Sequence, residues 1–357
     1  MNSNRVYIDF HVIQTVPPSC VNRDDTGSPK TAVYGGVRRA RVSSQSWKRA
    51  IRKMFMDNFN ESELGVRTKK ILSLIQGRIL EMDTSKTESE AIALAEDVIK
   101  AAGVTTKDLE ARALFFMSSK QAENLARLAI EGQFEKKVVQ NALKEGNGVD
   151  VALFGRMVAD DPSLNTDASA QVAHAISTHR VDNEYDYFTA VDDLAPEDNA
   201  GAGMIGTVEY NSSTLYRYAT VAGHILFEQL AESPDVTAKA IKEFARGFIT
   251  SMPTGKQNTF ANRTLPDGVV VSIRTDQPIN LAGAFEAPVV AKDTGYSAQS
   301  LVRLIDYAEK NYSDYFGLPQ KAWVISESLS KLGEVVSLPK LLDDLESELL
   351  AAFSDNQ

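Results

Sequence analysis

Residues 6–12 read VYIDFHV, and this stretch decides the fold that the sequence predicts. Its apolar residues, Val6, Ile8, Phe10 and Val12, alternate with Tyr7, Asp9 and His11. A period of two is typical of a strand with one buried and one exposed face. A loop rich in turn-forming pairs follows from Pro17 to Gly36. We therefore expect the chain to begin with a strand of a core sheet.

A helix is predicted directly after this loop, capped by Ser43 or Ser44 and ending near Phe55. Further helices are expected over residues 84–102 and 109–131 within a mostly helical block at 61–146, and over 238–252 and 338–353. Strands are expected over 207–210, 215–221 and 269–273, with a protruding loop or a loose hairpin at 179–206. Without the helical block, the order is βαββαβ, that of an RRM-type, ferredoxin-like sheet. The predicted fold class is therefore α+β.

The composition excludes several classes of protein. The 357 residues are long for one compact core, so two or three folded units are expected. No apolar run reaches the roughly 18–20 residues of a membrane span, and the N-terminus lacks a secretory pattern. A single cysteine, Cys20, excludes an intrachain disulfide framework and a multi-cysteine zinc site. We expect a soluble, cytoplasmic protein.

The distribution of charge is uneven. The net charge is −10 and the pI about 5.1, which argues against a generic nucleic-acid binder. The segment 30–53, however, has eight basic residues and no acid: Lys30, Arg38, Arg39, Arg41, Lys48, Arg49, Arg52 and Lys53. Residues 341–357 carry five acids and no Lys or Arg. Such a chain can bind a polyanion at one place and repel it elsewhere.

The predicted helix gathers part of this segment on one face. At about 100° per residue, one arc holds Gln45, Lys48, Arg49, Arg52 and Lys53, and the opposite arc holds Trp47, Ala50, Ile51, Met54 and Phe55. No acid stands at i,i+4 to neutralise the cations. The first turn adds free N–H groups and serine hydroxyls, a favourable seat for a phosphate. The ordinary alternative is a solvated helix face, but the pattern favours polyanion binding.

Several blocks of sequence then resemble one family. They are PSCVNRDDTGSPKTAVYGGVRRARVSSQSWKRAIRK at 18–53, GVDVALFGRM at 148–157, AHAISTHRVDNEYDYFTAVDDL at 173–194, SSTLYRY at 212–218 and TGKQNTFA at 254–261. The chain resembles the CasC-type backbone subunit of type I-E CRISPR Cascade complexes, in the RAMP superfamily. Residues from about 60 to 145 carry no matching motif.

The resemblance implies a hand-like, non-catalytic RNA-binding subunit. An RRM-like palm would comprise residues 1–58 and 207–357, helical fingers 59–178, and a thumb hairpin 179–211. Copies would stack head to tail along a CRISPR RNA, kink it at intervals and display the guide for pairing with a target DNA strand. The implied partners are CRISPR RNA, target DNA, further copies and other Cascade subunits, with no cofactor.

The resemblance also implies which residues contact RNA. By position these are Arg23, Ser43, Gln45, Lys48, Arg49, Arg52, Lys256 and Gln257. Arg38, Arg39 and Arg41, which lie just before the basic helix, are also assigned to RNA binding. Tyr187 and Phe188 match an aromatic pair that wedges at the displaced nucleotide, and Met157 is a second wedge candidate. The segment 179–206 has seven acids and one arginine, so stacking would have to hold it on RNA. The alternative for the aromatic pair is packing within the hairpin.

Two other functions stay open. Asp24 and Asp25 match a loop in which related type III backbone subunits use an Asp for metal-dependent cleavage of target RNA. A turn-forming or Arg23-paired role is the alternative for these acids. A self-assembling scaffold without nucleic acid is the other class. The four histidines lack zinc-motif spacing, and neither a nucleophile elbow nor a phosphate-binding loop occurs, so no metal or cofactor is expected.

Overall fold

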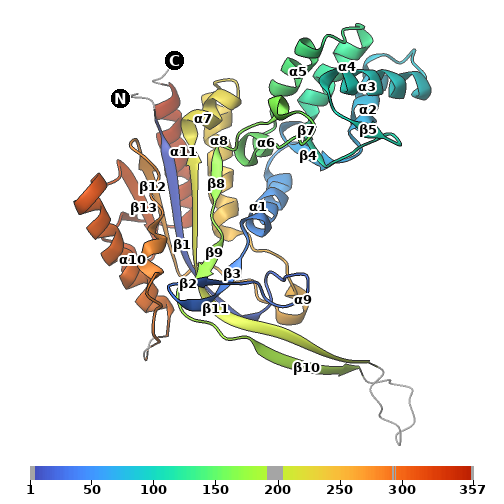
Figure 1. The fold of residues 1–357 in the computed structure, drawn as a ribbon. Coiled ribbons are helices and arrows are strands. Elements are labelled where there is room, and N and C mark those ends of the chain that lie inside the picture. Colours follow the sequence, from blue (N-terminus) through green and yellow to red (C-terminus); the bar gives the residue numbers. More distant parts are fainter. Residues whose placement is uncertain (1–4, 191–203, 292, 294, 355–357) are drawn as a thin grey trace, which may run out of the picture.

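The computed structural model describes residues 5–190, 204–291, 293 and 295–354 of the chain. One large sheet carries helices on both faces, and a group of helices stands apart from it (Figure 1). The predicted α+β class is confirmed. Among the described helices, none combines the length and the apolar composition that crossing a bilayer requires.

The strands of the structure are β1 Tyr7–Ser19, β2 Thr31–Tyr34, β3 Val37–Val42, β4 Gly65–Thr68, β5 Thr106–Lys107, β6 Glu110–Ala111, β7 Phe115–Ser118, β8 Ala170–Val172, β9 Ala175–Ser177, β10 Glu184–Ala190, β11 Met204–Ala222, β12 Gly268–Arg274, β13 Lys321–Ile325 and β14 Glu334–Val335. The α-helices are α1 Ser44–Asn58, α2 Ile71–Met82, α3 Glu88–Ala102, α4 Ser119–Ile130, α5 Lys136–Lys144, α6 Val149–Phe154, α7 Gly223–Gln229, α8 Pro234–Thr250, α9 Gln257–Phe260, α10 Ser297–Asn311 and α11 Leu338–Ser354.

The large sheet has the order β14-β13-β12-β1-β11-β9-β3-β2, with β8 and β10 also paired to β11. Its central strand β1 is antiparallel to both β11 and β12. Helices α1, α8 and α11 cover one face, where their side chains share a core with Ile8, Phe10 and Val12 of β1. The helix predicted near Phe55 is therefore confirmed, and it packs on the sheet through Ile51 and Phe55.

The prediction that β1 exposes one face is wrong. Asp9 and His11, on the opposite face from Phe10, are each only 1% exposed. Helix α10 and the 3-10 turn Leu281–Phe285 cover this second face and form a core with Ile13. The polar groups are satisfied internally, since Tyr218 Oη donates to Asp9 Oδ1 at 2.9 Å. The sequence pattern of a strand that is buried on both faces, with hydrogen-bonded polar residues on one of them, is therefore the same as that of a half-exposed strand.

Two other predicted elements need correction. Residues 207–210 and 215–221 belong to one continuous strand, β11, rather than to two paired strands. The polar residues between them continue the strand because they pair with β1, as Ser213 does with Val16. The helix predicted over 109–131 begins only at Ser119, because Phe115–Ser118 pairs as β7 with β4.

The helices between β4 and α6 have a core of their own. Helices α2, α3, α4 and α5 bury residues such as Ile75, Ala95 and Leu125 against one another. Helix α6 instead contributes Val149, Ala152 and Leu153 to the core beneath the sheet. This short helix therefore anchors the helical insertion to the large sheet.

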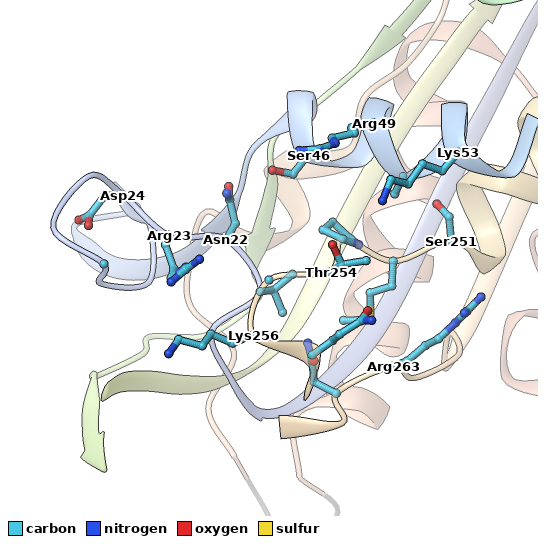
Figure 2. A pocket seen from close by; sticks show the side chains of 18 of the residues that line it. Asn22, Arg23, Asp24, Ser46, Arg49, Lys53, Ser251, Thr254, Lys256 and Arg263 are labelled. Atoms are coloured by element: carbon cyan, nitrogen blue, oxygen red, sulfur yellow. The ribbon is translucent and has the colours of Figure 1, made fainter. Parts of the chain in front are cut away.

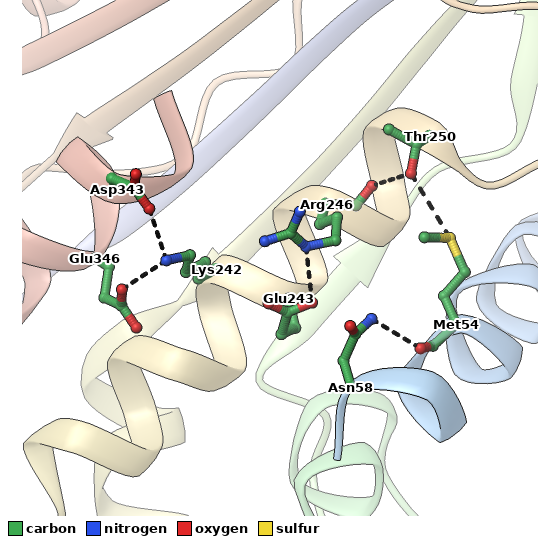
Figure 3. Close-up of polar contacts among 8 residues, drawn as sticks. All are labelled: Met54, Asn58, Lys242, Glu243, Arg246, Thr250, Asp343 and Glu346. Atoms are coloured by element: carbon green, nitrogen blue, oxygen red, sulfur yellow. Dashed lines mark hydrogen bonds and ion pairs between the residues drawn. The ribbon is translucent and has the colours of Figure 1, made fainter. Parts of the chain in front are cut away.

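The acidic C-terminal helix α11 is held to α8 by ion pairs (Figure 3). Lys242 Nζ donates to Asp343 Oδ1 at 2.9 Å and to Glu346 Oε2 at 2.7 Å. On the same helix Arg246 pairs with Glu243 at 3.0 Å. These cations of α8 are therefore matched by acids of the same chain.

Candidate nucleic-acid interface

A cavity of about 750 Å³ opens where three segments of the chain meet (Figure 2). The segments are the loop 21–27, the N-terminal part of α1, and the segment 251–263 that follows α8. Gly255 makes the closeness of the two loops possible, because a Cβ at this position would collide with the carbonyl oxygen of Val21. The cavity thus joins stretches that are more than two hundred residues apart in sequence.

The wall of the cavity is basic. Five cations line it, Arg23, Arg49, Lys53, Lys256 and Arg263, against two acids, Asp24 and Asp25. Within the part of the chain that the structure describes, none of the five cations forms an ion pair with an acid. By contrast, Lys242 of α8 pairs with Glu346 of α11, and Arg246 pairs with Glu243 of its own helix. Unpaired cations in a concavity attract a polyanion even when the whole protein is acidic.

Helix α1 directs two of these cations by its amphipathic packing. The Ser43 side chain caps the helix by accepting from the Ser46 N–H, so Ser43 is occupied structurally. Trp47 and Ile51 are buried, which turns Arg49 and Lys53 toward the cavity (Figure 2). Gln45 is exposed at the start of the helix but does not line the cavity.

The other cations of the predicted row face the helical insertion. Lys48 Nζ lies 5.7 Å from the centre of the Phe154 ring, and burial lowers the pKa of Lys48. Arg52 Nε donates to Asp150 Oδ2 at 3.0 Å. Burial raises the pKa of Asp150 although Arg52 opposes this shift. The four cations of the predicted row therefore lie on two sides of α1: Arg49 and Lys53 line the cavity, and Lys48 and Arg52 face α6.

The three arginines upstream of α1 have different surroundings. On β3, Arg38 is exposed and Arg39 is 0% exposed, because neighbouring residues of a strand point to opposite faces. The Arg39 guanidinium donates to the carbonyl oxygens of Ser177, Phe285 and Glu286. Its donors therefore lie on backbone acceptors in the interior, and its assignment to RNA binding stays a prediction. Arg41 is half-buried and donates to the Thr31 carbonyl oxygen and to His174 Nδ1.

Asp24 forms a turn within its own loop. Its Oδ1 accepts from the Thr26 hydroxyl at 2.7 Å and from the backbone N–H groups of Thr26 and Ser28, each at 3.0 Å. The hydrogen bond from the Thr26 hydroxyl is the main cause that holds the pKa of Asp24 below its ordinary value. Between Arg5 and Ser354, the described residues contain no group of three His, Cys, Asp or Glu side chains placed to hold a metal ion.

The hairpin of β10 and β11 separates the predicted wedge residues. Tyr187 is 63% exposed, whereas Phe188 is half-buried and packs over Gly206 on the paired strand. Tyr185, two residues before Tyr187 on the same face, is equally exposed. Met157 is exposed on the loop after α6. Four of the seven predicted acids, Asp192, Asp193, Glu197 and Asp198, lie outside the described residues.

The structure brings together some predicted residues and adds others. Arg23, Arg49, Lys256 and Gln257 all line the cavity. Lys53, Arg263, Ser251 and Asn262 line it too, but they were not among the predicted contacts. Lys53 could have been found from its place in the helical row. Ser251, Asn262 and Arg263 lie outside the motif at 254–261, and no pattern in the sequence marks them as binding residues. Only the tertiary fold brings them near α1.

Comparisons with known proteins agree with this fold. The sequence model of a family described as "CT1975-like protein" matches residues 8–347. A solved chain of a "CRISPR RNA-guided surveillance complex, pre-nicking" is 34% identical over 96% of this chain and 100% of that chain, with a TM-score of 0.83. A chain of a "CRISPR RNA-guided surveillance complex" is 31% identical over 96% and 99%, with a TM-score of 0.63. Among curated proteins none matches significantly.

Proposed function

The chain belongs to the CT1975-like protein family, and we propose that it is a CRISPR RNA-binding backbone subunit of a Cascade surveillance complex. Both similar structures belong to CRISPR RNA-guided surveillance complexes and match nearly the whole chain. The observation that carries the proposal is the cavity lined by five cations that pair with no acid among the described residues, in a protein of net charge −10. Within this proposal we assign the subunit to the type I-E class and to the cytoplasm.

The cavity suits the backbone of a single strand rather than its bases. Arg49 and Lys53 approach from α1, Arg23 from the loop before it, and Lys256 from the segment after α8 (Figure 2). Cations from three directions can neutralise successive phosphates along a bent strand. The protein would then hold the RNA by shape and charge, while base pairing of the guide selects the target.

We assign three parts to the subunit. The sheet with α1, α8 and α11 is the RRM-like palm, residues 1–58 and 207–357, and the antiparallel strands β12-β1-β11 with these helices on one face support the assignment. Residues 59–178 form the fingers, in which α2, α3, α4 and α5 have a separate core, while α6, β8 and β9 at the end of this range join it to the large sheet. Residues 179–211 form the thumb, which includes the β10–β11 hairpin (Figure 1).

The thumb and the cavity together suggest how copies assemble. The hairpin extends away from the sheet at the end where α9 lies (Figure 1), and Gln257 of α9 lines the cavity, so the hairpin can reach a neighbouring subunit placed along the same RNA. A head-to-tail contact of this kind generates a filament rather than a closed dimer. The exposed Tyr187 would then stack at the displaced nucleotide, and the guide would face a target DNA strand and the other Cascade subunits.

We propose that the subunit does not cleave RNA. The turn around Asp24 gives this carboxylate a structural role, since it accepts three hydrogen bonds within its loop. Incubating the RNA-loaded protein with Mg²⁺ and labelled complementary RNA tests this directly. We expect intact RNA; regular cleavage that disappears in the Asp24→Ala or Asp25→Ala variant would establish the endonuclease instead.

RNA binding is tested with the double variant Arg49→Ala/Lys256→Ala and the control Lys310→Ala, which removes an exposed cation of α10. Binding of a labelled single-stranded RNA is measured from 50 to 400 mM salt. We expect the slope of log K against log salt to fall by roughly 0.7 for each lost phosphate contact in the double variant, and to stay unchanged in the control. A wild-type protein that assembles after nuclease treatment and binds no RNA would support the nucleic-acid-free scaffold.

A further inference from the structure

Asn262 has an unusual position in the wall of the cavity. The residue is 1% exposed, yet neither its Nδ2 nor its Oδ1 has a hydrogen-bond partner among the described residues. Ser251 is 4% exposed, and its Oγ also lacks a partner there. Both residues line the same cavity as the five cations. The wall therefore contains three buried polar atoms whose hydrogen-bonding capacity is unused.

Such atoms are rare in folded proteins because an unpaired buried polar group costs free energy. A leucine of similar size would avoid this cost. The unpaired amide does not strengthen the fold of the free subunit, and a partner from outside the subunit explains its place beside the cations.

The chemistry of the amide defines that partner. A phosphate oxygen can only accept, so it would satisfy Nδ2 and leave Oδ1 unpaired. A ribose 2′-hydroxyl can donate to Oδ1 and accept from Nδ2 or from the Ser251 hydroxyl. The cations of the wall suit the phosphates, and the sugars lie between the phosphates along the strand. Only RNA carries the 2′-hydroxyl.

We propose that Asn262, together with Ser251, binds a ribose 2′-hydroxyl of the strand in the cavity and thereby selects RNA over DNA. This inference rests on the proposed RNA-binding function. Asn262 and Ser251 would provide the discrimination between RNA and DNA. The cations cannot provide it, because Arg49 and Lys256 attract the phosphates of either nucleic acid equally.

Binding at Asn262 requires that the segment 254–263 shift, and the backbone of this segment is strained in a way that such a shift can relieve. Less than 1 Å² of each amide atom is exposed, so the ribose meets the amide only after a shift of residues 254–263. Lys256 and Ala261, on either side of the four-residue α9, have φ of 49° and 47°. Residues with a Cβ adopt this left-handed region rarely and at a cost, which a shift on binding can relieve. Lys256 lies in the cavity and can pull the segment toward a phosphate.

The experiment compares the full-length wild type with Asn262→Leu, using RNA and DNA strands of the same sequence and length. We expect the wild type to prefer RNA. In Asn262→Leu the affinity for RNA should fall about tenfold, the size of one lost hydrogen-bonded contact, while the affinity for DNA stays the same. The melting temperature of the variant without nucleic acid should be equal to or above that of the wild type.

Lys256→Ala is the matched comparison, because it should weaken RNA and DNA binding by the same factor. Ser251→Ala provides a second variant with a smaller change of shape, and it too should lower the ratio of RNA to DNA affinity. A reduced melting temperature with an unchanged ratio in both variants would make the two residues structural and overturn the inference. A wild type that binds RNA and DNA equally also overturns it but leaves the proposed function standing. A wild type that binds neither refutes both.

Discussion

The guanidinium carbon of Arg217 lies 3.7 Å from the centre of the Trp47 ring, in the interior near the start of α1. The ring of Phe248 from α8 lies 4.7 Å from the same carbon. Arg217 also donates to Gln14 Oε1 at 2.6 Å, and Gln14 in turn donates to the Thr264 carbonyl oxygen at 2.9 Å. One buried cation on β11 therefore links α1, α8 and the end of the segment that lines the cavity.

Arg217→Lys should destabilise the protein although it keeps the charge. A lysine lacks the planar guanidinium that contacts the rings of Trp47 and Phe248, and it lacks the separate Nη1 and Nη2 that donate to Gln14 Oε1 and to the Phe248 carbonyl oxygen. We expect the free energy of unfolding to fall by about 2–3 kcal/mol, the contribution of one to two hydrogen bonds to a charged group. Urea denaturation measures this. An unchanged free energy would show that the stacked geometry contributes nothing.

Arg52→Ala should weaken the attachment of the helical insertion. It leaves the buried Asp150 carboxylate without its cation, while the Gly65 N–H still donates to it at 2.7 Å. We expect a loss of about 1–3 kcal/mol in the free energy of unfolding. The double variant Arg52→Ala/Asp150→Asn should recover part of this loss because the buried charge is removed. If the second substitution adds to the loss instead, the ion pair is not the cause.

Tyr187→Ala and Phe188→Ala should have different effects. Tyr187 is exposed, so its loss should leave the hairpin intact and single-subunit RNA binding unchanged but disturb the regular spacing of nuclease protection in assembled filaments. Phe188 packs over Gly206, so its loss should expose the hairpin to limited proteolysis. Identical protection patterns for wild type and Tyr187→Ala would remove Tyr187 as the wedge.

Asp9→Asn should raise stability more at pH 7.5 than at pH 5.5. Burial raises the pKa of Asp9 to about 6 from 3.8 in the unfolded chain, despite hydrogen bonds from Ile279 N–H and the Tyr218 hydroxyl. A carboxyl with a raised folded-state pKa contributes stability at pH values below 3.8 and loses it as the pH rises through 6.

The asparagine lacks this loss and can still accept from Ile279 N–H and donate to Tyr218 Oη. The difference in free energy of unfolding between variant and wild type should therefore grow by about 1 kcal/mol from pH 5.5 to 7.5. Parallel urea titrations at the two pH values measure it. A constant difference would mean that Asp9 titrates near its ordinary pKa.

The elements that sequence predicted best are those whose signal is local. Helix α1 combines a serine cap with a regular arc of Trp47, Ile51 and Phe55, and the structure reproduces both. Strand β7 was predicted as part of a helix, because its partner Gly65–Thr68 lies about fifty residues earlier. The single strand β11 was divided at its polar residues, because their pairing with β1 cannot be seen locally.

The candidate site could be predicted only in part for the same reason. Arg49 was found because helical periodicity places it on the exposed arc. Charge alone does not separate Arg38 from Arg39, although neighbouring residues of a strand point to opposite faces and Arg39 is the buried one. Arg263 and Asn262 reach α1 only through the fold, and whether a polar side chain lacks a partner is a property of three-dimensional packing alone.

The nineteen residues of β11 form one strand, which pairs with β1 in the middle of the sheet and, beyond a register shift opposite Val16 and Ser19, with β10 in the hairpin. The direction of the hairpin is therefore fixed by the same hydrogen bonds that hold the core together. A copy whose hairpin rests on a neighbour would impose the tilt of its own sheet on that neighbour. The twist of this one strand would then determine the helical pitch of the filament. A small change in the twist would add up from copy to copy along the assembly.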